Sequence, residues 1–288
     1  MSYPSLSSFL TSGVTRVPSG PVAVLFVEDD ASVRETSEHH DKQGFAAHLV
    51  IGDMPGLADL VATMGERFIH IEAAVRTRDD AVEHLNALME VLSGHWVFWG
   101  FNAEFLFYPY CESRTINDLT SFLHEERRDH AFTYTVDLYA QDLYRHPNAV
   151  SLDTAYFDGS GYYGFQRYEN GEALERQVNV FGGLGWRFEE FVPWDRRRID
   201  RVSLFRAKAG LRVGLDLRLS EPEMNTVACP WHHNVTIAMA SFRVAKSLKR
   251  NPGSTFEVDS MLWRRSLRFD WSSQQMMEEG LIEPGQWF

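Results

Sequence analysis

Apolar runs alternate with helix-like segments through the first 109 residues, and this alternation constrains the fold more than any other feature. The runs at 21–30 and 46–53 are apolar and end in acids, which is typical of strands buried on both faces of a parallel sheet. The clearest helix lies between later runs at 78–94, where apolar residues follow helical spacing. The pattern predicts an α/β fold, with a mostly parallel sheet and helices on both of its faces.

Polar residues follow the predicted strands, and ligands of such sheets bind beyond the carboxyl ends of the strands. The stretch HWVFWGFNAEFLFYP, residues 95–109, is the most informative, because a buried strand opens onto Asn102-Ala103-Glu104 and closes again on aromatics. We therefore expect a site at this edge of the sheet, built from Asp29, Asp30, Asp53, Asn102 and Glu104.

The second half of the chain is less regular. We expect residues 1–20 to form a tail or strap over the surface. The other predicted elements are a helix at 116–129, a strand at 130–142, a loop-rich aromatic segment at 156–190, two short strands around a turn at 199–220, a helix over 229–253 and a helix with a packed tail at 268–288.

Composition excludes several classes of protein. With 44% hydrophobic residues in 288, the chain can bury a large core, and its net charge of -12 argues against sequence-independent nucleic-acid binding. The two cysteines, Cys111 and Cys229, suggest no disulfide framework. We find no signal-peptide pattern and no apolar stretch of about 20 residues that could span a bilayer, so we expect a cytoplasmic protein.

Several segments together resemble a known family. In order along the chain they are VAVLFVEDDASVRETSEHHDKQGF, HWVFWGFNAEFLFYP, FTYTVDLY, GGLGWR and HHNVTIAMASFRVA. Over about residues 22–246 their order and spacing are similar to the family-2-like glycosyltransferases of the GT-A fold.

The resemblance implies transfer of a sugar from a nucleotide-sugar donor to a glycan or other hydroxyl acceptor, as in polysaccharide biosynthesis. It also implies a domain division: an N-terminal tail at 1–20, a GT-A-like domain at 21–250, and a C-terminal extension at 251–288 packed on that domain. Within the domain, 21–136 would hold the nucleotide and 137–250 would shape the acceptor side.

Residue roles follow only where the family's motifs match. Asp137 in Asp-Leu-Tyr would be the general base that deprotonates the acceptor, and Glu104 would be a second catalytic acid that orients the sugar or acceptor. The Gly182-Gly183 motif has Gly185 where the family has an arginine. The donor and its nucleotide would be bound by Asp29, Asp30, Asp53, Asn102, Arg187, His233 and Arg243.

The resemblance departs from the family at the metal site. The two aspartates that usually hold a divalent cation fall on Phe101 and Ala103, which offer no oxygen ligand, and only Glu104 and Phe105 keep the motif. We therefore expect no metal cofactor, with Mg²⁺ or Mn²⁺ as the alternative. Basic side chains would then stabilise the leaving diphosphate, with Arg187, His233, Arg243 and the run 196–198 as candidates.

Other interpretations stay open. The chain could be a non-catalytic GT-A-fold protein that binds sugars or nucleotides or serves as a scaffold, or another nucleotide-binding α/β protein. At single positions, Asp30 could cap the helix expected from Ala31, and Glu104 could be a half-buried acid paired with a nearby arginine. Asp137 could be a hydrogen-bonded strand-end acid, and His232 and His233 could be structural.

Overall fold

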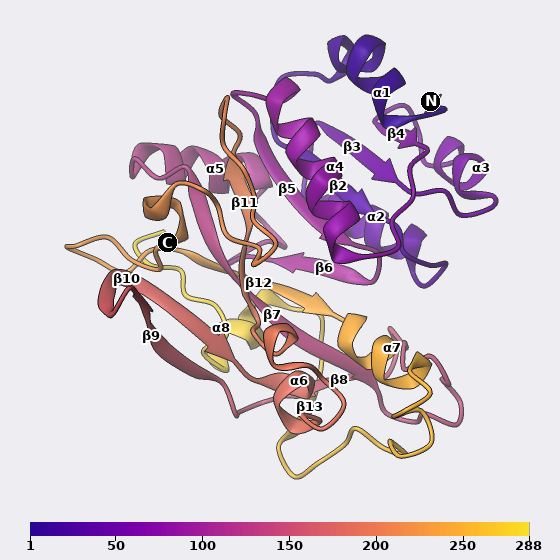
Figure 1. The fold of residues 1–288 in the computed structure, drawn as a ribbon, viewed down its shortest axis with the longest axis vertical. Helices are drawn as coiled ribbons and strands as arrows, with labels where there is room; N and C mark the ends of the chain where they lie inside the picture. The colour runs from indigo at the N-terminus through magenta and orange to yellow at the C-terminus, as the bar shows by residue number, and fades with distance from the viewer. Residues whose placement is uncertain (288) are drawn as a thin grey trace. The chain divides into compact units, whose positions relative to one another are not determined.

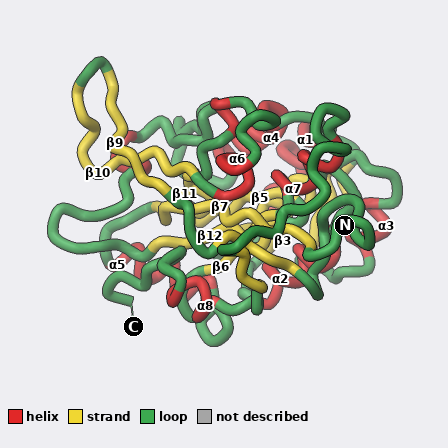
Figure 2. The backbone as a smooth tube through the Cα atoms, turned by 90° about the horizontal axis from the view of Figure 1, so that it is seen from below, coloured by secondary structure: helices red, strands yellow, loops and turns green. Residues whose placement is uncertain are grey.

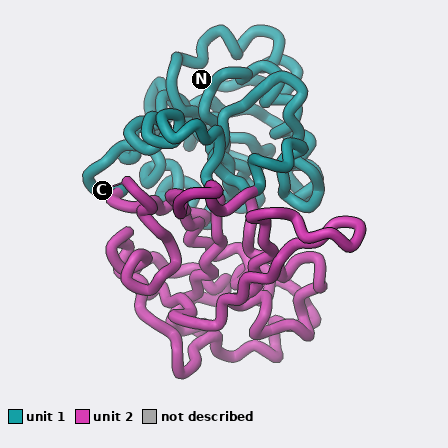
Figure 3. The backbone as a smooth tube through the Cα atoms, turned by 90° about the vertical axis from the view of Figure 1, so that its left-hand side faces the viewer, with its two compact units in different colours: residues 1–102, 111–131, 202–225 teal, residues 103–110, 132–201, 226–288 magenta. Residues whose placement is uncertain are grey.

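The computed structural model describes residues 1–287 and shows a mixed α/β protein with a large, mostly parallel central sheet (Figure 1). The chain forms two compact units, coloured separately in Figure 3. Unit 1 comprises 1–102, 111–131 and 202–225, and unit 2 comprises 103–110, 132–201 and 226–287. Each unit is thus assembled from three separate segments of the chain.

Unit 1 contains most of the parallel strands. Their order is β1-β4-β3-β2-β5-β11, with every pair parallel except β5 and β11. The strands are β1 (Ser2–Tyr3), β2 (Val22–Phe26), β3 (Ala47–Ile51), β4 (Phe68–Ile71), β5 (Trp96–Phe101) and β11 (Asp200–Arg206). The helices are α1 (Leu6–Ser8), α2 (Val33–Lys42), α3 (Leu57–Ala62), α4 (Arg78–Val91) and α5 (Ile116–Glu125), with short turns η1 (Phe9–Gly13), η2 (Val14–Arg16) and η4 (Pro222–Asn225).

Helices cover both faces of this sheet, as the apolar runs predict. Alternate residues of β2 point to opposite faces. Val24 packs in one core with Leu85 of α4, whereas Leu25 packs in another with Val33 of α2 and Leu57 of α3. The predicted α/β architecture is therefore confirmed, and the strands predicted at 21–30 and 46–53 are β2 and β3.

Unit 2 has a mixed sheet and a separate hairpin. Its strands run in the order β6-β12-β7, with β8 on β7 and β13 on β8. Strands β9 and β10 form a separate two-stranded hairpin, which is seen in Figure 2. The strands are β6 (Glu104–Phe107), β7 (His130–Ala140), β8 (Ala155–Asp158), β9 (Tyr163–Glu169), β10 (Glu172–Phe181), β12 (Thr236–Ser241) and β13 (Ser266–Arg268). The helices are α6 (Gly183–Arg187), α7 (Arg243–Arg250) and α8 (Ser273–Glu278), with the turn η3 (Trp194–Arg196).

The predicted helix over 229–253 was wrong in its first half. Residues 236–241 form β12, every residue of which is buried, and only α7 is helical. The sequence TIAMAS is short, apolar and small, so it suits a central strand and a buried helix equally by composition. Pairing with β7 and β6 on its two sides decides the outcome in favour of a strand.

Other predicted elements also differ. Residues 1–20, expected to form a tail or strap over the surface, include β1, in which Tyr3 pairs with β4, and Phe9, which is fully buried against the ring of Tyr3. The segment predicted as loop-rich contains β8, the β9–β10 hairpin and α6. Of the two strands predicted at 199–220, the first is β11 and the second is only an isolated bridge, Val213 to Leu219.

The C-terminal segment packs on the sheet of unit 2. Trp271 contacts Phe105, and Phe269 contacts Phe107 and Phe157, with ring centroids 4.9 to 5.8 Å apart. These rings cover the sheet face opposite the one that carries Glu104. Phe288, the last residue of the predicted extension, lies outside the described residues.

Asn102, at the end of β5, fixes the loop that follows β2. It is completely buried; its side-chain carbonyl accepts from the N–H of Glu28 at 2.9 Å, and its amide donates to Asp29 Oδ1 at 2.7 Å and to the carbonyl of Ala31 at 2.9 Å. The next residue, Ala103, adopts a left-handed conformation with φ of 60° and reverses the chain into β6.

Replacing Asn102 by alanine should destabilise the protein. The change leaves buried backbone groups without partners, which costs on the order of 1–3 kcal/mol each, so we expect a loss of about 2–4 kcal/mol in the free energy of unfolding by urea denaturation. Asn117→Ala, on the exposed face of α5, should change it by less than about 0.5 kcal/mol. A loss at Asn102 no larger than at Asn117 would contradict this role.

Candidate active site

A row of polar side chains crosses the buried sheet of unit 2. Glu104 on β6 is the register partner of Ser241 on β12, and Ser241 is the partner of Asp137 on β7. The β7–β8 register places Asp158 beside Asp137, and Asp158 is the partner of Ser266 on β13. Register partners project from the same face of a sheet, so three carboxylates and two hydroxyls share one face.

The carboxylate at the β6 end of the row has a cation. Arg201 Nη2 lies 2.6 Å from Glu104 Oε2, and both side chains are almost completely buried. Ser241 donates from Oγ to Glu104 Oε1 at 3.0 Å. Glu104 is therefore paired with an arginine, as the alternative interpretation has it, but the acid is almost fully buried rather than half-buried.

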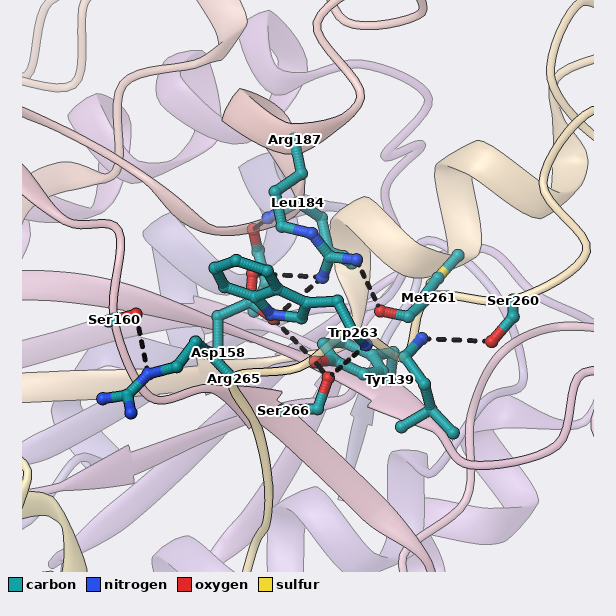
Figure 4. A network of polar contacts seen from close by, with 12 residues as sticks. Tyr139, Asp158, Ser160, Leu184, Arg187, Ser260, Met261, Trp263, Arg265 and Ser266 are labelled. Atoms are coloured by element: carbon teal, nitrogen blue, oxygen red, sulfur yellow. Dashed lines mark hydrogen bonds and ion pairs between the residues drawn. The ribbon is translucent and has the colours of Figure 1, made fainter.

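The carboxylate of Asp158 is also neutralised (Figure 4). Arg187 Nη1 lies 2.8 Å from Asp158 Oδ1, which also accepts from Tyr139 at 2.6 Å and from Trp263 Nε1 at 2.8 Å. Arg187 Nη2 donates to the carbonyl of Met261 at 2.7 Å. This network ties α6 to β7, β8 and the segment before β13.

Asp137, between these two pairs, has no cation among the described residues. It is 2% exposed; its Oδ2 accepts from the N–H of Leu184 at 2.8 Å, and its Oδ1 has no hydrogen-bond partner. Burial raises the pKa of Asp137 to about 7, the charges of Asp158 and Glu104 raise it further, and bonds from the N–H groups of Leu184 and Gly185 oppose the rise. A carboxyl with a pKa near neutrality can take or give a proton at physiological pH.

The Gly182-Gly183 pair lets the chain pass close to this acid. Gly183 has a left-handed φ of 63°, and a Cβ there would lie 2.5 Å from Asp137 Oδ2. A Cβ at Gly182 would lie 2.6 Å from the ring of Tyr162. Neither contact tolerates a larger residue, so the glycines are required for the approach of α6 to β7 and to Tyr162.

The predicted nucleotide-binding acids of unit 1 have different surroundings. Asp29 is held by Asn102, and Oδ1 of Asp29 accepts from the N–H of Ala31. Asp30 is exposed and does not cap the helix, since α2 begins at Val33 with Ser32 as its N-terminal cap residue. Asp53 forms an ion pair with Arg76. The fold therefore brings together Asp29 and Asn102 but assigns no ligand to any of the four.

The predicted basic residues of unit 2 do not converge. His233 has a side chain 86% exposed, with Nδ1 3.9 Å from Glu283 Oε2. The N–H of Arg243 donates to Ser241 Oγ at 3.2 Å, which places the start of α7 beside the polar row. The arginines of the run at 196–198 each lie near a carboxylate: Arg196 near Asp195, Arg197 near Glu189 and Arg198 near Asp200.

The positions of the family's metal ligands do not fit a cation. Phe101 is buried in the core of unit 1, 5.8 Å from the ring of Phe26 and 6.2 Å from that of Trp99. Ala103 is buried and carries only a methyl group. Among residues 1–287, no group of three or more His, Cys, Asp or Glu side chains is arranged to hold a metal ion. These donor sets supply no ligand cage for Mg²⁺ or Mn²⁺.

Sequence reasoning missed Arg201, Asp158, Tyr162 and Ser241. Ser241 was hidden by the wrong helix assignment, and Asp158 by the assignment of its strand to a loop. For Arg201, no local pattern identifies the partner, because strand register alone brings residues 97 positions apart, Glu104 and Arg201, into contact. The Gly-Gly pair was the one available signal for Tyr162.

Comparison with known proteins identifies no family. No family profile matches the chain, and no curated protein does. Similar solved structures include a protein assigned as a glucose-1-phosphate thymidylyltransferase from Bacillus anthracis in complex with a sucrose, at 8% identity and a TM-score of 0.32, covering 65% of this chain and 72% of that one.

Two further structures have similar scores. A CMP:2-keto-3-deoxy-manno-octonic acid synthetase in complex with CTP has 10% identity and a TM-score of 0.32, covering 66% of this chain and 76% of that one. A CTP:phosphocholine cytidylyltransferase from Streptococcus pneumoniae has 10% identity and a TM-score of 0.26, covering 90% and 99%. Scores this low identify no activity, so the resemblance to glycosyltransferases stays a prediction. None of the described helices is long and apolar enough to cross a membrane.

Replacing Asp137 by asparagine should remove a pH-dependent cost. The native state keeps the proton of Asp137 up to about pH 7, whereas the unfolded chain loses it near 3.8. Between these values the native state binds more protons, so this group makes the wild-type free energy of unfolding fall as pH rises. Above pH 7, Asp137→Asn should be more stable by up to about 4 kcal/mol, and the difference should vanish near pH 4.

Urea denaturation at several pH values measures this effect. Asp153→Asn, at an exposed position of the same unit, should follow the wild-type curve. A pH dependence of Asp137→Asn that matches the wild-type one would show that Asp137 is not a neutral buried acid.

Replacing Gly183 by alanine should be more harmful than replacing a glycine of the same backbone conformation elsewhere. Gly171 has φ of 87°, and no atom lies within 4 Å of the position that a Cβ would take there, so Gly171→Ala incurs only the backbone strain of about 1–2 kcal/mol. Gly183→Ala adds the collision with Asp137, and we expect a total loss of about 3–5 kcal/mol in the free energy of unfolding. Equal losses in the two variants would show that α6 moves away freely.

Proposed function

We propose that this protein transfers a sugar from a nucleotide-sugar donor to a hydroxyl group, with Asp137 as the general base. The observation that carries the proposal is the unpaired, buried carboxylate of Asp137 in a row where the other two acids have arginines. The family resemblance of the sequence supplies the donor class. No step needs a metal ligand at Phe101 or Ala103.

The proposed chemical step uses Asp137, the acceptor hydroxyl and the nucleotide-sugar donor. The acceptor hydroxyl gives its proton to Asp137 Oδ1, the acceptor oxygen forms a bond to the anomeric carbon, and the bond from that carbon to the diphosphate oxygen breaks. The nucleoside diphosphate leaves with the bonding electron pair. A base on the acceptor oxygen suits a single displacement with inversion.

The pKa of Asp137 suits this role. A base is most effective when its pKa is near the working pH, because a substantial fraction is then ionised and the carboxylate is still basic enough to accept the proton. The charges of Asp158 and Glu104 help to raise the pKa of Asp137. The arginines that pair with these two acids keep them from acting as bases themselves. In this proposal Glu104 acts on Asp137 electrostatically rather than on the substrate.

Nucleotide binding is assigned to the strand ends of unit 1. Asp29, Asp30 and Asp53 follow β2 and β3, and Asn102 follows β5, at the carboxyl ends of parallel strands. Asp29 and Asn102 hold one another, so the nucleoside would meet a preformed loop. Asp30, exposed beside that loop, would be the acid available to a ribose hydroxyl.

Fewer basic side chains are available to stabilise the leaving diphosphate than the sequence suggests. Arg187 is engaged by Asp158 and Met261, and the arginines at 196–198 lie near acids. Arg243 and His233 remain the candidates for the diphosphate. Of these, Arg243 begins a helix whose first N–H meets the polar row.

A non-catalytic binding protein is the second candidate function. The observation in its favour is that the acid of the resembled motif, Glu104, is neutralised by Arg201, and that carbon side chains occupy both metal positions. Such a protein would bind a nucleotide sugar without consuming it.

Release of nucleoside diphosphate tests both functions. Wild-type protein with UDP-, GDP-, CDP- and dTDP-sugars, mixed acceptor sugars and EDTA should release the diphosphate from at least one donor, at a rate that rises with pH through about 7. Loss of a general base costs roughly 10²–10⁴-fold, so Asp137→Asn should fall by at least 100-fold in kcat. Asp153→Asn is the control and should keep full activity.

Thermal-shift measurements with the same nucleotides separate the outcomes. Stabilisation by a nucleotide in both wild type and Asp137→Asn, with no release in either, would support the binding protein. A shift that requires Mn²⁺ would contradict the metal-free proposal.

A further inference from the structure

Two side chains that lie against the Gly182-Gly183 pair each carry a buried polar atom with no hydrogen-bond partner. The two atoms are Oδ1 of Asp137 and the hydroxyl of Tyr162. The backbone of Tyr162 precedes β9 and the residue is half-buried, but its hydroxyl oxygen is inside. Leaving a buried polar atom unpaired costs on the order of 1–3 kcal/mol, and such atoms in a native structure point to a missing partner.

Both side chains lie against the Gly182-Gly183 pair, and the charge of Asp137 is near enough to help raise the pKa of Tyr162. A Cβ at Gly183 would lie 2.5 Å from Asp137 Oδ2, and a Cβ at Gly182, its neighbour in the chain, would lie 2.6 Å from the ring of Tyr162. The ring of Tyr162 packs against the apolar cluster of Phe132, Val180 and Ile199, which limits its movement.

The chemistry of the pair selects the ligand. Burial raises the pKa of Tyr162, and the charges of Asp158 and Asp137 raise it further, so its hydroxyl stays protonated and is a donor. The carboxylate of Asp137 is an acceptor. A hydroxyl group satisfies both at once, because it donates one hydrogen bond and accepts another.

Other ligand groups match the pair less well. A phosphate or carboxylate would meet the negative charge of Asp137. An ammonium group has no lone pair to accept from Tyr162.

We propose that Tyr162 and Asp137 together form a two-point binding site for a hydroxyl group of a sugar, with Tyr162 as a further substrate-binding residue. The proposal rests on the proposed function in one respect: the bound hydroxyl is taken to be the acceptor that Asp137 deprotonates. The hydroxyl of Tyr162 donates a hydrogen bond to the acceptor oxygen. The O–H of the acceptor then points at Asp137 Oδ1.

Binding of methyl glycosides tests the site without a donor. Methyl α-glucoside, α-galactoside and α-mannoside are titrated by ligand-observed NMR at pH 8 into wild type, Tyr162→Phe and Asp137→Asn. At least one should bind the wild type, and Tyr162→Phe should weaken it about 5- to 10-fold, as expected for one lost hydrogen bond. Tyr168→Phe, on the exposed face of the hairpin, should bind as the wild type does.

Measurements of Tm show whether Tyr162→Phe weakens glycoside binding only because it destabilises the protein. Tyr162→Phe removes a hydroxyl without a protein partner and should not lower Tm. Tyr139→Phe removes bonds to Asp158 and Ser266 and should lower Tm by several degrees. A Tm loss in Tyr162→Phe as large as in Tyr139→Phe would overturn the proposal, as would equal glycoside affinity of wild type and Tyr162→Phe, or no binding of any methyl glycoside to the wild type.

The hydroxyl site and the proposed transferase activity can fail independently, and the measurements distinguish the two cases. If glycoside binding depends on Tyr162 while no nucleotide sugar is turned over, the hydroxyl site stands and the transferase does not. If diphosphate release depends on Asp137 and Tyr162→Phe leaves the KM for the acceptor unchanged, the transferase stands and the hydroxyl site does not.

Discussion

Three carboxylates lie in one buried row of the unit 2 sheet, and within residues 1–287 two guanidinium groups, those of Arg201 and Arg187, neutralise two of them. The low polarity of the interior makes an unpaired charge costly, so the row can be stable only if one acid remains largely protonated near neutral pH or meets a partner from outside. Asp137 is that acid. The glycines against it, the short helix that donates to it and the arginines that remove its neighbours from competition all follow from this one imbalance.

The surrounding network shows how such an imbalance is kept. Tyr139, Trp263 and Arg187 converge on the single carboxylate of Asp158, and Arg187 continues to Met261. These contacts hold α6 in register with β7, so that the N–H of Leu184 meets Asp137 rather than water. The stability of the network thus maintains a group that is itself unfavourable, which is the usual arrangement at functional sites.

Much of unit 1 could be predicted from the sequence, because its strands are continuous apolar runs separated by helices with their own terminal signals. The sequence pattern also identified the triplet after β5 as important, although its three residues have different roles. Asn102 fixes a loop, Ala103 turns the chain and Glu104 belongs to the polar row. The row itself could not be predicted. It depends on the register of five strands, one of which, β12, has a composition that fits a helix as well, and register is set by tertiary packing rather than by local pattern.

The division of the chain between the two units has a consequence for how the protein folds. Six stretches alternate between the two, so the backbone passes from one to the other five times. No single cut yields an autonomous half, and neither unit can complete its hydrophobic interior on the ribosome until residues beyond 200 have emerged. Assembly therefore has to be a late, largely concerted event dominated by contacts between distant parts of the chain, which makes it slow and exposes unfinished sheet edges to other chains in the meantime.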